Sequence, residues 1–278
     1  MSRHRGVDWQ WRLVMAIAAK EWRDRLRNRW VVAVALVFAA FALLIAYFGG
    51  AQSGAIGLRS TAATVASLTS LAIYLVPLIA LLLGFDAVVG ERERGVLDLL
   101  LSLPVRRAEL LMGKYLGLAA ALGVSTFAGF GAALVPLAPM LDGPSVLLYL
   151  RFVGSAWLLG LAFLSMAVLV STLARDRARA TGAAIALWFG FVLVFDLSLL
   201  GVLVASAGRY ASTWAPYALL LNPADVFRVI NVFGADALRS AFGLGTLLPQ
   251  GWNAPATLYG AMAAWIVAPL GLALWRFR

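Results

Sequence analysis

Long runs without charge alternate along this chain with short stretches rich in arginine, lysine and acidic residues. A helix needs roughly 20 apolar residues to cross a hydrocarbon core of about 30 Å. The pattern therefore predicts an all-α membrane protein with six transmembrane helices per subunit. The six expected spans are residues 30–48, 60–85, 115–141, 152–174, 180–208 and 256–275. An even number of spans places both ends of the chain on the same side of the membrane.

The segment before the first span, residues 1–29, has its own periodicity. One side of a helical wheel carries Trp11, Val14, Met15, Ala18, Trp22 and Leu26, and the opposite side carries Arg12, Lys20, Arg23 and Arg27. This pattern predicts an amphipathic elbow helix that lies in the lipid headgroup region and leads into the permease domain, residues 30–278. A solvated basic tail is the alternative.

Composition excludes a soluble globule, because 63% of the residues are hydrophobic, only 13% are charged and the mean hydropathy is +0.89. The net charge of +10 would suggest nucleic acid in a soluble protein. Here 18 of the 23 basic residues fall on one side of the expected topology and five on the other. Because basic residues concentrate in cytoplasmic segments, we expect both termini in the cytoplasm and no nucleic-acid partner.

Side-chain chemistry narrows the function further. The chain has no cysteine and a single histidine, His4, so thiolate or zinc sites are not expected. The expected spans contain no histidine or lysine and one acidic residue, Asp196, which argues against an intramembrane protease. They also lack the polar stripe of a channel. The methionines are single and scattered, so we expect this subunit to hold no metal and to conduct no copper.

Asp196 lies 16 residues into the fifth expected span, about 24 Å along the helix axis. An ionised carboxylate at that depth costs a few kcal/mol, roughly, unless it has a partner or faces a water-filled cleft. Arg151 and Arg209, near the outer boundary, are the expected partners. A structural ion pair and a cavity lining both remain open.

Two loops stand out by their charge and length. The loop between spans two and three predicts a short amphipathic helix over residues 91–103, ended by Pro104; a solvated loop with internal ion pairs is the alternative. The outer loop, residues 209–253, contains a charge-free stretch that is too short to span and is broken by Pro216. It predicts a re-entrant or interfacial segment. After it, Asp225 and Arg228, and then Asp236 and Arg239, are spaced for pairing within a helix.

The stretch from Glu91 to Arg107, followed by Glu109-Leu110-Leu111 and Gly113-Lys114, resembles the signature of ABC-2 type permeases, the membrane subunits of ATP-binding cassette transporters. Residues 64–71 and 222–228 are similar to one subfamily, the permeases of the copper-processing transporter that matures nitrous oxide reductase. The length and the six-span plan agree with this subfamily over nearly the whole chain. The resemblance implies the bacterial cytoplasmic membrane.

The resemblance also implies partners and sites. It implies a homodimer, each subunit docked on one of two copies of a cytoplasmic ATPase, which would bind the ATP and magnesium. The docking element would offer Glu91, Arg92, Glu93 and Arg94 as polar contacts and Val96, Leu99 and Leu100 as its packing face. A periplasmic copper-handling protein would dock on Asn222, Asp225, Arg228, Asp236 and Arg239. The only lysines, Lys20 and Lys114, complete no phosphate-binding loop, so no ATP hydrolysis by this chain is expected.

Two mechanisms are open for such a subunit. It exports a species other than copper, for which a sulfur compound is one candidate, or it transmits motion mechanically to an outer partner. A generic ABC-2 exporter of lipid, glycan or drug is the alternative function.

Overall fold

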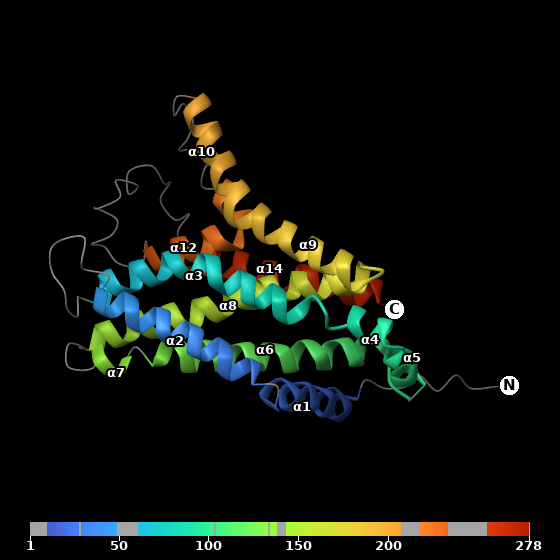
Figure 1. Ribbon diagram of the computed structural model, residues 1–278. Helices are drawn as coiled ribbons and strands as arrows, with labels where there is room; N and C mark the ends of the chain where they lie inside the picture. The colour runs from blue at the N-terminus through green and yellow to red at the C-terminus, as the bar shows by residue number, and fades with distance from the viewer. Residues whose placement is uncertain are drawn as a thin grey trace.

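The computed structural model describes residues 10–27, 29–48, 61–102, 104–132, 134–137, 143–206, 217–232 and 255–277. Within these ranges the secondary structure is helical and contains no strand. Five long helices run side by side: α2 (Trp30–Phe48), α3 (Thr61–Gly84), α6 (Arg107–Gly131), α8 (Gly143–Leu173) and α14 (Pro255–Arg276) (Figure 1). The expected all-α membrane fold is confirmed.

The two ends of the bundle differ. At one end, which we call the corner end, lie α1 (Trp11–Arg27) and the short helices α4 (Val89–Glu93) and α5 (Val96–Leu101), near the end of α14 (Figure 1). At the other end, called here the far end, lie the start of α3 and the short helix α7 (Leu134–Leu137) (Figure 1). This polarity separates the two charged regions that the sequence singled out.

Five helical segments of the described chain are long and apolar enough to cross a membrane, and a sixth is obtained when the bent pair α1 and α2 is counted as one span. Two of them start earlier than predicted. Helix α6 starts at Arg107 rather than 115, because Glu109 accepts the backbone N–H of Arg106 (3.0 Å) in a capping box. Helix α8 starts at Gly143 rather than 152 and has 31 residues, about 46 Å, so it is longer than the hydrocarbon core.

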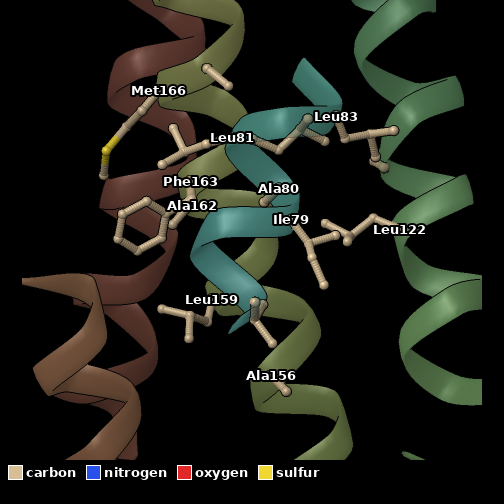
Figure 2. Packing of buried hydrophobic residues seen from close by; sticks show 14 of the residues in the cluster. Ile79, Ala80, Leu81, Leu83, Leu122, Ala156, Leu159, Ala162, Phe163 and Met166 are labelled. Carbon is tan, nitrogen blue, oxygen red and sulfur yellow. The ribbon is translucent and has the colours of Figure 1, made fainter. Parts of the chain in front are cut away.

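The core of the bundle lies between α3 and α8. Figure 2 shows Ile79, Ala80 and Leu81 of α3 beside Ala156, Leu159, Ala162 and Phe163 of α8, with Leu122 of α6 on the opposite side of α3. These side chains are nearly or fully buried. Alanine and leucine alternate along the contact, so that the two backbones approach closely while the larger side chains fill the space between them.

Helix α1 packs along α6, because two glycines of α6 leave room for it. A Cβ at Gly113 would lie 2.7 Å from Ile17 Cβ, and a Cβ at Gly117 would lie 2.6 Å from the carbonyl oxygen of Ala18. Val14 and Ala18 are buried in this contact, whereas Trp11 and Met15 of the same predicted stripe are exposed. The predicted amphipathic face is therefore divided between α6 and the surroundings, and Ile17, which lies off that stripe, packs on Gly113.

We expect Gly117→Ala to destabilise the protein, because the new methyl group collides with the backbone of α1. The cost of such overpacking is about 1–3 kcal/mol. Gly154→Ala in α8 is the matched control, since nothing lies within 4 Å of its Cβ position and alanine favours a helix over glycine. Thermal unfolding of both variants in detergent checks the prediction, which fails if Gly117→Ala is as stable as Gly154→Ala.

The fifth predicted span is a composite helix. It begins as α9 (Arg177–Phe189), passes through one π-helical segment η3 (Gly190–Val194) and continues as α10 (Phe195–Ala205). At its centre the N–H of Phe195 donates to the carbonyl of Gly190, five residues back. Helix α10 leaves the bundle at an angle (Figure 1), and its large apolar residues, such as Leu197, Leu200 and Val204, are exposed.

Candidate functional site

The charged corner between α3 and α6 contains two short helices. The sequence predicted one helix over residues 91–103, and that prediction is corrected: α4 ends at Glu93 and α5 starts at Val96. Gly95 between them has a φ of 70°, a conformation that a glycine adopts without the penalty of a Cβ. The chain thus turns between the charged half and the apolar half of the motif. Helix α5 ends before Pro104, as expected.

Glu91, in the first turn of α4, points into the protein. Its Oε1 accepts a hydrogen bond of 2.6 Å from Nζ of Lys114, whose ammonium also lies 3.4 Å from Oε2 of Glu21 in α1. Arg25 pairs with the other oxygen of Glu21 at 3.2 Å. Lys114 is only 4% exposed, and both carboxylates are buried. Glu91 therefore joins α4, α6 and α1, and this structure does not present it on the surface as the sequence analysis expected.

The rest of α4 is fastened to the turn between α8 and α9. Ser171 Oγ of α8 accepts the backbone N–H groups of Val88 (2.9 Å) and Val89 (3.1 Å). Arg92 donates to the carbonyl of Ala174 at 2.8 Å. These bonds fix the position of the corner relative to the end of α8.

Arg177, the first residue of α9, is held by two acidic residues of the corner. Its guanidinium forms an ion pair with Asp86 (Nε to Oδ1, 2.8 Å), and its backbone N–H donates to Oε1 of Glu93 (2.7 Å). A carboxylate at a helix N-terminus is stabilised by the unpaired N–H groups and by the helix dipole. Displacement of the corner therefore acts directly on the start of α9.

The opposite surface of the corner is exposed. Arg94, Val96 and Leu99 project from it, and Leu99 is 69% exposed, whereas Leu97 is buried and Leu100 is half-buried. Among the predicted docking residues, Arg94, Val96 and Leu99 are therefore the ones most accessible to a partner. Arg92 and Glu93 are exposed but already bonded to the α8–α9 turn.

A second polar cluster lies where α12 meets the start of α10. Nη2 of Arg228 in α12 (Pro223–Val232) forms an ion pair with Oδ2 of Asp196 in α10 at 2.7 Å. Nη1 of the same guanidinium is paired with Oδ1 of Asp225. Asp196 thus has a partner, but it is neither of the two that were expected: Arg151 forms no such pair, and Arg209 lies outside the described residues.

Asn222 links this cluster to the π-helical segment. Its Nδ2 donates to the carbonyl of Phe191 (2.8 Å) and to Oδ2 of Asp225 (3.0 Å), and its Oδ1 accepts the N–H of Ala224 (2.9 Å). Because the N–H of Phe195 donates to Gly190, the carbonyl of Phe191 lacks its ordinary helical partner. Asn222 supplies one. The π turn and the Asn222-Pro223-Ala224-Asp225 motif therefore depend on each other.

Helix α12 is inside the protein, packed among α3, α8 and α14. Phe191, which contacts its start, is 14 residues beyond Arg177, about 21 Å along the composite helix. Asn231 near its end exchanges hydrogen bonds with Ser155 of α8, donating at 2.9 Å. The re-entrant or interfacial segment expected from residues 210–224 stays a prediction, because residues 210–216 lie outside the described residues.

Burial of α12 corrects the expected docking surface for an outer partner. The side chains of Asn222 and Asp225 are fully buried, and that of Arg228 is 37% exposed. Asp236 and Arg239 lie outside the described residues. Asn222, Asp225 and Arg228, three of the five predicted docking residues, thus hold α12 in place, because their polar groups find partners within the protein.

The sequence did not predict the residues that complete the cluster around Glu91. Lys114 was placed just before a span and Glu21 within a helix of mostly basic charge, so neither suggested a buried pair. One signal was available: Lys114 is one of two lysines in the chain and directly precedes a long apolar run. Within the described ranges, no three histidine or acidic side chains come close enough to hold a metal ion.

Comparisons with known proteins match nearly the whole chain. The family described as ABC-2 family transporter protein matches residues 15–278. The chain is 46% identical over 273 residues to the probable ABC transporter permease protein NosY of Pseudomonas aeruginosa, covering 96% of this chain and 98% of the relative. It is 44% identical over 272 residues to the protein of the same name from Stutzerimonas stutzeri, covering 95% and 98%.

Proposed function

Because this chain belongs to the ABC-2 family of transporter permeases, a multi-pass family of the bacterial inner membrane whose ATPase activity belongs to a partner subunit, we propose that it transmits the work of that ATPase to copper-site maturation of nitrous oxide reductase. A periplasmic copper-handling protein receives the motion at the far end. The subunit itself conducts no copper and holds no cofactor. Both termini and the corner end face the cytoplasm.

The observation that carries this proposal is a continuous chain of polar contacts from the corner to α12. Asp86 forms an ion pair with Arg177 at the start of α9, and Glu93 accepts its backbone N–H. The same helix continues through η3, where Asn222 holds the carbonyl of Phe191, to Asp196, which is paired with Arg228 of α12. A helix held at its start and again at Phe191 and Asp196 passes tilting at the first contact on to the second. This arrangement favours mechanical transmission over export.

The ATPase docks on the exposed surface of Arg94, Val96 and Leu99. The two short helices with Gly95 between them present an apolar face beside a free charge, the composition of a small protein interface. Their inner contacts, to Ser171 and Lys114, keep the surface from moving independently of α8 and α6. Glu91 acts in this scheme as an internal anchor.

The subunit works as a homodimer. Few side chains of the composite helix α9–α10 are buried, and bulky ones such as Leu197 and Val204 are exposed, although α3 and α8 are buried over most of their length. A second copy packed on this helix places the two α9–α10 helices, and the polar contacts that they make, next to each other. Each copy binds one ATPase subunit, so two ATPase subunits close beneath the pair.

Charge reversal at the corner tests the proposed docking. We expect Arg94→Glu and Leu99→Asp each to weaken co-purification with the cognate ATPase by about tenfold or more, because a central apolar contact or its charged neighbour is worth about 1–2 kcal/mol in an interface. Arg23→Glu, an exposed arginine of α1, is the matched control and should leave co-purification unchanged. The readouts are ATPase recovered per permease and ATP turnover of the complex in nanodiscs.

The same variants connect docking with function. Nitrous oxide reductase from cells carrying Arg94→Glu should lack its copper centres, while the periplasmic partner still associates with the far end. Normal copper loading by a variant that no longer recruits the ATPase would show that the permease does not transmit ATPase work, and the proposal would then be abandoned.

A further inference from the structure

A basic cleft of about 480 Å³ opens at the corner end, on the inner side of α5. Four arginines line it, and each comes from a different part of the chain: Arg92 of α4, Arg107 at the start of α6, Arg175 in the α8–α9 turn and Arg276 at the end of α14. The fold therefore brings these side chains together from segments up to 184 positions apart. Each guanidinium is exposed at the mouth of the cleft.

Positive charge in the cleft is largely uncompensated. Asp98 is the one acidic residue in its lining. Arg92 donates to the carbonyl of Ala174, but the guanidinium groups of Arg107, Arg175 and Arg276 make no hydrogen bond or ion pair with another residue in the described part of the chain. Guanidinium groups that converge without acidic partners favour an anion with several oxygens, and their planar donor fork suits phosphate.

The remaining wall of the cleft is apolar. It is formed by Leu97 and Leu101, one turn apart on α5, by Leu173 at the end of α8 and by Phe277 after α14. Both α8 and α14 are long and apolar enough to cross a membrane, and the cleft lies beside their last residues at the corner end. A free phosphate would use the arginines alone, whereas a phospholipid would use the arginines for its headgroup and the apolar wall for its chains.

We propose that this cleft binds the phosphate headgroup of an anionic phospholipid. Basic pockets between membrane helices at the cytoplasmic surface bind such headgroups, and each basic side chain near the membrane surface contributes about 1 kcal/mol. The site is separate from the proposed ATPase surface, because Val96 and Leu99 face outward from α5 while Leu97 and Leu101 face the cleft. A bound lipid thus braces α5 against α8 and α14. The lipid site does not rest on the proposed function.

Lipid retention by the purified, full-length subunit without its ATPase tests the proposal. Native mass spectrometry in detergent would compare phosphatidylglycerol, phosphatidylcholine and inorganic phosphate as probes. Wild-type protein should retain phosphatidylglycerol in preference to phosphatidylcholine, and the double variant Arg175→Gln/Arg276→Gln should bind it roughly ten- to thirtyfold more weakly. The control pair Arg23→Gln/Arg179→Gln removes two exposed arginines outside the cleft and should keep the wild-type affinity.

Each contrary result overturns the proposal. Equal retention of phosphatidylglycerol by both double variants shows that the lipid binds elsewhere. Displacement of the lipid by inorganic phosphate at equal concentration shows that the cleft takes a free anion. Co-purification of the variant Arg175→Gln/Arg276→Gln with the ATPase is measured separately, and lost ATPase binding with unchanged lipid retention shows that the cleft receives acidic side chains of the ATPase. If the double variant fails to fold, the single variant Arg276→Gln carries the same comparison.

Discussion

Lys114→Met should be among the most damaging single substitutions in this protein. Lys114 is the buried cation between Glu91 and Glu21, so its loss leaves two carboxylates facing each other with only Arg25 close to one of them. Breaking a buried ion pair by removing one partner costs about 3–5 kcal/mol. We expect a corresponding loss in the free energy of unfolding, measured by denaturant titration in detergent, and poor recovery of folded protein.

The only other lysine of the chain provides the control. Lys20 pairs with Asp24 at 3.3 Å on the exposed side of α1, where an ion pair one helical turn apart is worth less than about 0.5 kcal/mol. Lys20→Met should therefore be nearly neutral. The double variant Lys114→Met/Glu91→Gln should recover part of the lost stability, because it removes one of the unpaired charges. Similar stability of the two lysine variants would contradict the buried anchor.

Arg228→Gln should have an effect of comparable size at the other cluster. This side chain neutralises Asp225, which is fully buried, and Asp196 of α10. Without it the fully buried carboxylate of Asp225 has no cation beside it, which costs up to about 3–5 kcal/mol, and the link between α10 and α12 is lost. We expect both a lower stability and a loss of nitrous oxide reductase maturation, while the ATPase still binds at the corner.

A second pair with the same spacing is available for comparison. Arg179 pairs with Asp176 three residues earlier, as Arg228 does with Asp225, but both partners are exposed. Arg179→Gln should leave stability and maturation near wild type. Restoring neutrality with Asp196→Asn and Asp225→Asn in the Arg228→Gln background should recover stability without recovering maturation. Recovery of both would mean that the ion pairs hold α12 in place but do not transmit motion.

The pattern of apolar residues predicted the membrane-spanning helices correctly over most of their length. Charge-free length located the apolar helices, because a span that crosses hydrocarbon must be apolar over its whole length. It failed at the helix ends, where α6 and α8 continue past Lys114 and Arg151. Lys114 is tolerated inside α6 because Glu91 and Glu21 supply partners, and no local pattern in the sequence records them.

The candidate site was only half visible for a similar reason. The exposed residues Arg94, Val96 and Leu99 were identified from the motif, because surface chemistry is local to it. Glu91, Asn222 and Asp225 were assigned to surfaces although each of them is buried. Polar residues in a loop normally face water, and their burial here depends on Lys114, Phe191 and Arg228, which lie 23, 31 and three residues away.

By itself, the sequence determined that this protein is a helical membrane protein, that it belongs among the ABC-2 permeases and that its corner carries the distinctive charge pattern. Those properties follow from composition, from the length of apolar runs and from a contiguous motif, all of which are written along the chain. Only the tertiary structure decided that α1 packs on two glycines of α6, that α12 enters the bundle to meet a π turn, and that four arginines converge behind α5. Such contacts arise from pairs of distant residues, whose proximity is set by how the helices pack.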